Sequence, residues 1–417
     1  MKLLFLANTC PLPATNGLTM RSSSVLSALS ALGHRVFLLS FVEAEPPEEI
    51  HRDLARLCFG YKFLKSDFAN VSSPGQYWSR LKNLWRSSPY GLLRYGSAAM
   101  RNQVLELLQQ ERFDAIVCDT IDSIIHLPAD ADVPVIVNNH NVEHLILERY
   151  LPHEHNPAKK LYGWLEAKKL RRWEAQACSR GRMVWVCSGF DREVLQQLCP
   201  GVHFEVVPNA IDTDSYVPSA AAVREPVVLY SGGMDWYPNR DAVKFFVHEV
   251  LPGLERQVPN VQFVVAGRAP SADFRRRVEC RNVTFTGTVP DMRPEIARAA
   301  VCVVPLRIGS GTRLKILEAA ALSKPVVSTS LGSEGLEFIP GKEIAIADEP
   351  SAFAARITEL LGDPELSLQM GRAARAKVCA KYGFDSLRHA IASSLETTFA
   401  TRSKKLQASV SECVGSR

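Results

Sequence analysis

The sequence predicts an α/β protein with two doubly wound, Rossmann-like domains. Short apolar runs, which are typical of buried parallel strands, alternate with segments of helical periodicity. This alternation occurs twice, on either side of a stretch at about 208–225 that resembles a linker. The 417 residues also suffice for about two to three domains.

The first series of elements forms the predicted N-terminal domain, 1–207. It opens with a strand at 2–7 and a helix at 21–32, which Gly33 is suited to end. Further strands are expected at 34–40, 113–119, 133–138, 183–187 and 204–207.

The second series forms the predicted C-terminal domain, 208–384. Its strands are expected at 227–230, 261–266, 283–285, 301–304, 325–328 and 344–347, and its helices at 241–255, 294–299 and 313–322. A helix at 385–399 is expected to pack back on the N-terminal domain, and 400–417 is expected to be disordered. Because parallel sheets bind ligands beyond the carboxyl ends of their strands, two such domains predict a central cleft.

Composition narrows the class of protein. Hydrophobic residues make up 46% and charged residues 22%, which is typical of a globular chain. No apolar run approaches the ~18 residues that span a bilayer, and the first run is too short for a signal-peptide core, so we expect a cytoplasmic protein. The ten cysteines form no CxxC pair and are expected to be reduced. The net charge of +5 comes without a nucleic-acid-binding motif, so no nucleic acid is expected.

Positive charge is concentrated in 155–182, which holds eight Lys and Arg residues against Glu166 and Glu174. Tyr162, Trp164, Leu165 and Trp173 are interspersed, as on an amphipathic helix. One interpretation is a solvated helix face whose aromatic side packs on the core. The other is a surface that rests on anionic lipid headgroups, which would place the protein peripherally on the inner face of the cell membrane.

A glycine loop in the second series indicates an anion site. Gly309 and Gly311 follow a strand, and a helix opens near Thr312. Arg313 and Lys315 lie in the first helical turn, where cations are unfavourable unless an anion binds. This arrangement favours a phosphate ligand.

Glu318 lies on the same helix, deeper than the expected phosphate position. A carboxylate there suits a pair of sugar hydroxyls. The alternative is an ordinary surface charge that pairs with Lys315 three residues earlier.

The order of motifs resembles one known family over about 1–395. The stretch 309–321 followed by 325–329 looks like the nucleotide-sugar signature of retaining GT-B glycosyltransferases of the family 4 group. Agreeing segments are 13–17, Arg21, 33–36, 186–188, 207–212, Gly267 and 285–287. Two more, 137–143 and 233–239, resemble a subgroup of bacterial sugar transferases of the surface-polysaccharide kind.

The resemblance implies transfer of a sugar from a nucleotide-sugar to a glycan or lipid-linked acceptor hydroxyl, with retention of configuration. It implies that Glu318 holds the ribose and that Gly17 belongs to a loop closing over the diphosphate. Gly309, Ser310 and Gly311 would lie next to the donor sugar and diphosphate, and Thr286 to Val289 would contact the base through backbone groups. UDP, GDP and ADP donors stay open.

Two departures from the family pattern concern charge. Ser310 stands where the family has the first glutamate of a pair. The family's Arg and Lys after the first strand of the second domain are also missing, because 231–239 contains neither. Arg313 and Lys315 are expected to replace that charge and to stabilise the departing diphosphate without a metal. Asp212 and Asp214 match the Asp-x-Asp pattern of a metal-binding motif, but they lie in the interdomain turn and are expected to be structural.

His140 follows an apolar strand of the first series and is expected to face the cleft. There it would hydrogen-bond the donor sugar or the acceptor, unless it merely caps the strand. Asp119, Asp122 and Asn141 are the acceptor-side candidates.

Two other function classes stay open: a nucleotide-sugar epimerase of the same build, and a binding subunit without catalysis. An NAD dehydrogenase is disfavoured because 8–17 lacks a GxGxxG arrangement.

Overall fold

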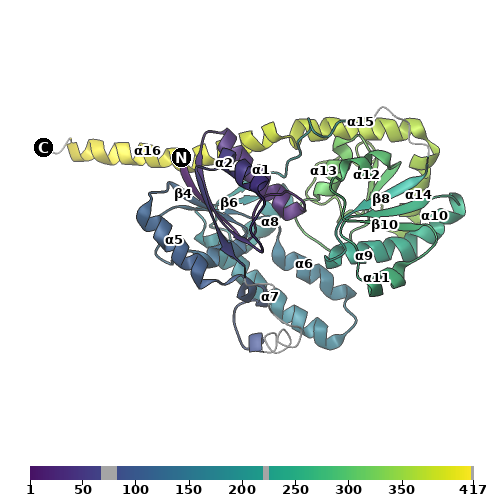
Figure 1. Ribbon diagram of the computed structural model, residues 1–417, viewed down its shortest axis with the longest axis horizontal. Helices are drawn as coiled ribbons and strands as arrows, with labels where there is room; N and C mark the ends of the chain where they lie inside the picture. The colour runs from purple at the N-terminus through teal and green to yellow at the C-terminus, as the bar shows by residue number, and fades with distance from the viewer. Residues whose placement is uncertain (67–81, 219–224, 415–417) are drawn as a thin grey trace. The chain divides into compact units, whose positions relative to one another are not determined.

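The computed structural model describes residues 1–66, 82–218 and 225–414, with backbone alone at 93–94 and 400–414. The chain divides into two compact units. The N-terminal unit consists of Met1–Pro208 with Asp385–Arg417, and the C-terminal unit is Asn209–Phe384. Each unit is a parallel sheet with helices packed on it (Figure 1). The predicted fold class, two Rossmann-like α/β domains, is confirmed.

The N-terminal unit holds a seven-stranded sheet in the order β3-β2-β1-β4-β5-β6-β7. The strands are β1 Lys2–Ala7, β2 Arg35–Val42, β3 Gly60–Lys65, β4 Ala115–Asp119, β5 Val135–Asn138, β6 Met183–Val186 and β7 Phe204–Val206. Asp119 pairs with Ala7 of β1 on one side and with Asn138 of β5 on the other. The register therefore brings the carboxyl ends of three strands level with one another.

Helices cover this sheet. They are α1 Gly17–Ala31, α2 Glu48–Leu57, α4 Tyr90–Tyr95, α5 Ala98–Gln110, α6 Glu143–Tyr150, α7 Pro157–Arg180, α8 Gly189–Leu198 and α16 Phe384–Val414, with 3-10 turns η2 Ile121–His126 and η3 Leu151–His153. The central strands are buried on both faces, as the continuous apolar runs predict.

The C-terminal unit holds a six-stranded sheet in the order β10-β9-β8-β11-β12-β13. Its strands are β8 Val227–Ser231, β9 Gln262–Ala266, β10 Val283–Gly287, β11 Val301–Val304, β12 Val326–Ser328 and β13 Ala345–Ile346. Its helices are α9 Tyr237–Phe245, the π-helical η4 Phe246–Val250, α10 Leu251–Gln257, α11 Ala272–Val278, α12 Arg293–Arg298, α13 Leu314–Ala321, α14 Pro350–Gly362 and α15 Pro364–Lys381.

Two predicted segments differ from the structure. The helix expected at 241–255 widens into the π turn η4 before α10 begins, and Pro252 in the first turn of α10 has no N–H to continue the regular ladder. The tail expected to be disordered at 400–417 is helical as far as Val414, because 400–414 contains neither proline nor glycine to end α16. Residues 415–417 lie outside the described part of the chain.

The C-terminal helix α16 packs on the N-terminal unit. Trp185 of β6 donates its indole N–H to Ser394 Oγ at 3.0 Å, and Arg182 Nη2 donates to the Thr398 carbonyl at 3.4 Å. Within the described residues, none of the helices combines the length and apolarity needed to cross a membrane.

Candidate functional site

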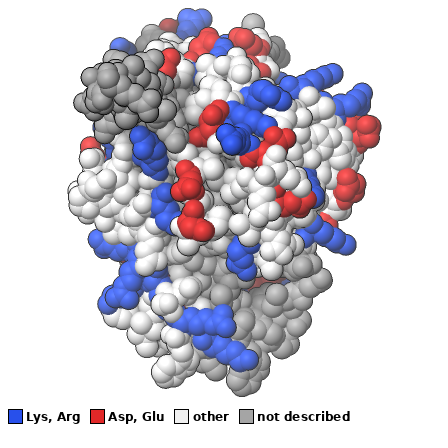
Figure 2. Space-filling view, turned by 90° about the vertical axis from the view of Figure 1, so that its left-hand side faces the viewer, with Lys and Arg blue, Asp and Glu red and all other residues white. Residues whose placement is uncertain are grey.

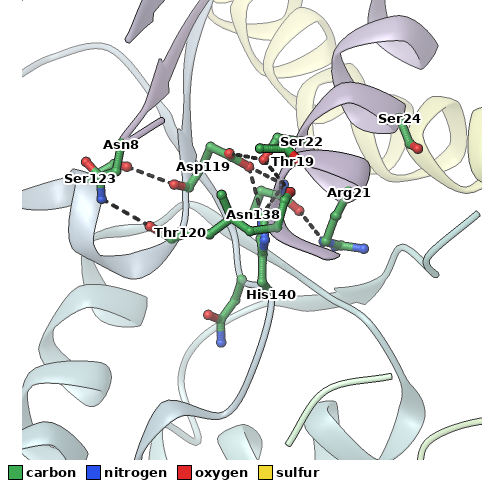
Figure 3. A network of polar contacts seen from close by, with 12 residues as sticks. Asn8, Thr19, Arg21, Ser22, Ser24, Asp119, Thr120, Ser123, Asn138 and His140 are labelled. Carbon is green, nitrogen blue, oxygen red and sulfur yellow. Dashed lines mark hydrogen bonds and ion pairs between the residues drawn. The ribbon is translucent and has the colours of Figure 1, made fainter. Parts of the chain in front are cut away.

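A buried polar network lies at the carboxyl ends of β4 and β5 in the N-terminal unit (Figure 3). Asp119 ends β4, Asn138 ends β5, and His140 follows two residues later. Each of the three is largely removed from solvent, Asp119 to 1% exposure and His140 to 8%. The parallel register is what places these polar side chains together at one sheet edge.

The Asp119 carboxylate is the centre of this network. Ser22 of α1 donates its hydroxyl to Oδ2, and Asn138 Nδ2 donates to Oδ1 at 2.7 Å. His140 Nε2 lies 2.8 Å from the same Oδ1 atom. Three partners therefore surround a carboxylate that a strand end holds in place.

Arg21 of α1 fixes the orientation of Asn138. Its Nε atom donates to Asn138 Oδ1 at 3.1 Å, and its Nη1 atom donates to the Val207 carbonyl at 2.9 Å. Gly17 is the first residue of the same helix, whose start is capped by Asn16. One helix thus carries both the predicted glycine loop and two members of the network.

The other acceptor-side candidates lie near a second acidic group. Asn141 Nδ2 donates to Glu143 Oε1 at 3.0 Å, and Glu143 N donates to Glu174 Oε1 at 2.9 Å. Burial, reinforced by neighbouring Asp122, raises the pKa of Glu143 to about 7. Burial and then Glu174 raise the pKa of Asp122 to about 6. Glu143 was not among the sequence candidates.

In the C-terminal unit, the glycine loop joins β11 to α13 as predicted. Gly309 has φ 146° and Gly311 has φ 72°, a region that favours glycine. A Cβ on Gly309 would lie 2.7 Å from Arg313 Nη2, so the loop and Arg313 fit closely. Arg313 is buried and donates Nη1 to the carbonyls of Ser310 and Gly311. Its guanidinium turns back onto the loop and shapes it.

Lys315 lies in the first turn of α13 and reaches the carboxyl end of β8. Its Nζ atom donates to Tyr230 Oη at 2.9 Å and to Asn239 Oδ1 at 3.3 Å. Burial and then the nearby Arg313 charge lower the pKa of Lys315 to about 7. A Cβ on Gly232 would lie 2.9 Å from this ammonium. The Lys315 ammonium therefore lies beside the segment after β8, in which the Lys and Arg expected from the resemblance are absent.

Glu318 faces a different partner from the one that the surface-charge alternative predicts. It accepts a hydrogen bond from Tyr216 Oη at 2.8 Å, and no ion pair joins it to Lys315 among the described residues. Burial raises its pKa. Arg293 lies over the Tyr216 ring, 5.9 Å from its centroid. Sequence reasoning missed Tyr216, Tyr230 and Asn239, because only the fold brings them to α13.

The remaining predicted positions lie in loops or, for Thr286, near the end of β10. Thr312 Oγ1 accepts from Asn209 Nδ2 at 2.7 Å. Thr286 donates its hydroxyl to the Gly287 carbonyl at 2.8 Å, and Val289 follows in the loop after β10. Asp212 Oδ1 accepts from Asp214 N at 3.2 Å, which is a local turn contact. In the described part of the chain, no group of three or more His, Cys, Asp or Glu side chains is arranged to hold a metal ion.

Comparison with known proteins follows the same division of the chain. The family described as Glycosyltransferase Family 4 matches residues 15–215, and the family described as Glycosyl transferases group 1 matches residues 225–363. Each match falls on one of the two parallel-sheet units, and both families are glycosyltransferases. The chain belongs to the family 4 type of GT-B glycosyltransferases.

Individual relatives are distant. An uncharacterised 44.6 kDa protein in the cps region of Klebsiella pneumoniae is 22% identical over 85% of this chain and 90% of its own length. A GDP-mannose-dependent α-(1-6)-phosphatidylinositol monomannoside mannosyltransferase of Mycobacterium tuberculosis is 27% identical over 49% of this chain and 58% of its own. The structure of Anabaena HepE with UDP and glucose superposes with a TM-score of 0.66 at 16% identity, covering 95% of this chain and 100% of that one. At this identity the superposition shows the fold alone.

Proposed function

We propose that this glycosyltransferase moves a sugar from a nucleotide-sugar donor to a hydroxyl of a glycan or lipid-linked glycan acceptor, with retention of anomeric configuration. The observation that carries the proposal is the arrangement on α13. One helix presents the Glu318 carboxylate and the Lys315 ammonium behind a loop whose glycines leave its backbone open to a ligand. HepE, whose structure holds UDP and glucose, supports the same class of donor.

Within this proposal, Glu318 binds the ribose hydroxyls of the donor. Its oxygen already accepts the Tyr216 hydroxyl at 2.8 Å, so a sugar hydroxyl would exchange one O–H donor for another or join it. Thr286 and Val289 lie in the segment that would contact the base through backbone groups. Because such contacts leave the base unspecified, UDP, GDP and ADP donors are tested together.

Lys315 stabilises the diphosphate as it leaves. Arg313 contributes through the shape of the loop, since its guanidinium donates to the carbonyls of Ser310 and Gly311. Gly309, Gly311 and Gly17 allow backbone amides to approach the phosphates. A fixed ammonium supplies the positive charge that other transferases take from a divalent cation, so we propose that no metal takes part.

In the N-terminal unit, His140 contacts a hydroxyl of the donor sugar or of the acceptor. Asp122 and Asn141 are the acceptor-side groups. Histidine suits this role because its neutral ring offers one nitrogen as a donor and the other as an acceptor.

We further propose that α7 rests on an anionic membrane that carries a lipid-linked acceptor, in surface-polysaccharide synthesis. Lys168, Arg171 and Arg172 are exposed on α7, and Leu161 and Trp164 are 61% and 46% exposed beside them. Of the aromatic residues expected to pack on the core, Trp173 does so, whereas Lys168 Nζ lies over the exposed Trp164 ring at 3.5 Å from its centroid. In the lower part of the face drawn in Figure 2, Lys and Arg side chains predominate over acidic ones.

Both acids of α7 face inward, so they do not reduce this exposed charge. Glu174 accepts from the backbone of α6, and Glu166 accepts from Asn83 Nδ2 at 3.0 Å. The Mycobacterium relative, whose printed name gives a phosphatidylinositol monomannoside as its acceptor, supports an acceptor at a lipid surface.

Thermal stabilisation by a panel of UDP-, GDP- and ADP-sugars tests the proposed donor class. We expect one nucleotide series to raise the melting temperature and Glu318→Gln to make that rise much smaller at the same ligand concentration. If no nucleotide-sugar binds, the proposal is wrong. Isomerisation of the bound donor would favour the epimerase, and binding without turnover would favour a non-catalytic subunit.

A further inference from the structure

The Asp119 carboxylate differs from an acceptor-binding group in its surroundings. It is 1% exposed and is surrounded by Ser22, Asn138 and His140. Even its backbone carbonyl accepts the Ser123 hydroxyl at 2.8 Å. A substrate hydroxyl would have to displace one of these partners. The function of Asp119 therefore lies in the side chains that it holds in place.

The hydrogens in this network can be assigned from its outer members. Arg21 Nε is always a donor, so the Asn138 atom 3.1 Å from it must be the amide oxygen. The Asn138 amide nitrogen then points toward Asp119 Oδ1, at 2.7 Å. This fixes the orientation of Asn138 without reference to His140.

The same reasoning assigns the proton on His140. Its Nε2 atom lies 2.8 Å from Asp119 Oδ1, a separation at which two bare acceptors would repel. Nε2 therefore carries a hydrogen. Asn138 Nδ2 and His140 Nε2, which lie 3.1 Å apart, are then two donors to the same Asp119 Oδ1 atom. In the neutral ring, Nδ1 is then the acceptor. Among the residues that the structure describes, none is hydrogen-bonded to His140 Nδ1.

We propose that Asp119 is a positioning residue that holds His140 as the Nε2–H tautomer, so that His140 offers a bare Nδ1 atom to a substrate hydroxyl. The role of Nδ1 rests on the proposed function, whereas the tautomer does not. Asn138 and, through it, Arg21 keep the carboxylate aligned. A bare Nδ1 atom accepts a hydrogen bond from a substrate hydroxyl, whereas a protonated Nδ1 could only donate one.

Nitrogen-15 NMR of the full chain tests the tautomer directly. In protein labelled at histidine, the His140 signals are assigned by their loss in His140→Gln. We expect Nε2 to resonate as a protonated nitrogen and Nδ1 as a bare one. A protonated Nδ1 with a bare Nε2 in the wild-type protein would overturn the proposal, and this reading needs no variant of Asp119.

Asp119→Asn tests the positioning role. Its amide can donate to Nε2, so we expect a mixture of tautomers or a reversal, with kcat/KM for transfer at least tenfold lower. The nucleotide-sugar series that stabilises wild type should still stabilise the variant, because the proposed ribose and diphosphate ligands Glu318 and Lys315 lie on α13. Ser123→Ala is the matched control: it removes a hydrogen bond to the Asp119 backbone and leaves the carboxylate untouched. We expect its tautomer and its kcat/KM to match wild type.

The possible failures are distinguishable. An unchanged tautomer and unchanged kcat/KM in folded Asp119→Asn would overturn the positioning role while leaving the proposed transferase intact. A wild-type protein that binds no nucleotide-sugar would instead overturn the proposed function. The nitrogen-15 spectrum of His140 would still decide the tautomer independently.

Discussion

The ammonium of Lys315 donates to the hydroxyl of Tyr230 across 2.9 Å, joining the first turn of α13 to the end of β8. The same Nζ atom lies 4.0 Å from the centroid of the Tyr230 ring. Tyr230 in turn donates to Asn239 Oδ1 at 2.7 Å. The Lys315 ammonium is thereby held in a buried polar setting, and among the described residues no carboxylate is hydrogen-bonded to it. The negative charge of a bound diphosphate would neutralise this ammonium.

The pH dependence of donor binding follows from this setting. Because burial and Arg313 lower the pKa of Lys315 to about 7, the side chain is a cation below pH 7 and increasingly neutral above it. An anionic donor binds the cationic form better, so affinity should fall as pH rises from 7 to 9, with proton uptake on binding at pH 8. Titration calorimetry in buffers of different ionisation enthalpy measures this uptake.

Lys315→Arg is the control for that titration. A guanidinium stays charged over the whole range, so donor affinity in this variant should lose its dependence on pH. Equal pH dependence in both proteins would show that another group is responsible.

Glu318→Gln is expected to weaken nucleotide-sugar binding without unfolding the protein. Loss of a charged hydrogen-bond acceptor costs about 1.5–3 kcal/mol, or roughly a 10- to 150-fold weaker Kd. Tyr216→Phe, which leaves the carboxylate in place, should have the smaller effect. Unchanged affinity in folded Glu318→Gln would remove the ribose assignment.

Metal removal should leave transfer largely intact. In the proposed mechanism the Lys315 ammonium takes the place of a divalent ion, so dialysis against EDTA is expected to change the rate by less than about twofold, an amount worth under ~0.5 kcal/mol. Loss of activity that Mg²⁺ or Mn²⁺ restores would mean that an acidic group, such as Asp212 with Asp214, acts as a ligand.

Changing Lys168, Arg171 and Arg172 to Gln should release the protein from anionic vesicles. Each basic residue near such a surface contributes about 1 kcal/mol, and the attachment should weaken at high salt. Lys169 is left unchanged because it donates to Glu166 at 3.0 Å and to the Asn83 carbonyl. Co-sedimentation with and without anionic lipid measures the effect.

A matched variant removes the same number of exposed charges from α11, where Arg275, Arg276 and Arg277 become Gln. It should still sediment with the vesicles. Equal binding of both variants, or no binding by wild type, would leave α7 as a solvated helix face.

The sequence predicted the elements whose pattern is local. The apolar runs of β1 and β11 and the spacing of Gly309 and Gly311 located two strands and the loop before α13. It did not predict β3, whose side chains are only partly buried at the sheet edge, so its apolar pattern is weak. Local pattern is thus sufficient where burial is continuous along the segment.

Partners distant in the chain were beyond such reasoning. Arg313 and Lys315 are two residues apart, yet one turns to its own loop and the other to Tyr230, 85 residues away. Glu166 and Glu174 resembled surface charges of a basic helix, but Asn83 and the start of α6 bury them. Their contacts are set by tertiary packing, which no spacing along α7 reveals.

The anomeric configuration of the transferred sugar tests the central claim most directly. The wild-type protein is incubated with the nucleotide-sugar that stabilises it, and proton NMR follows the sugar released to water or to an added glycan before the anomers equilibrate. We expect the product to appear first with the configuration of the donor, together with the free nucleoside diphosphate. A product of opposite configuration, or a nucleotide-sugar isomerised without loss of its diphosphate, would contradict a retaining glycosyltransferase.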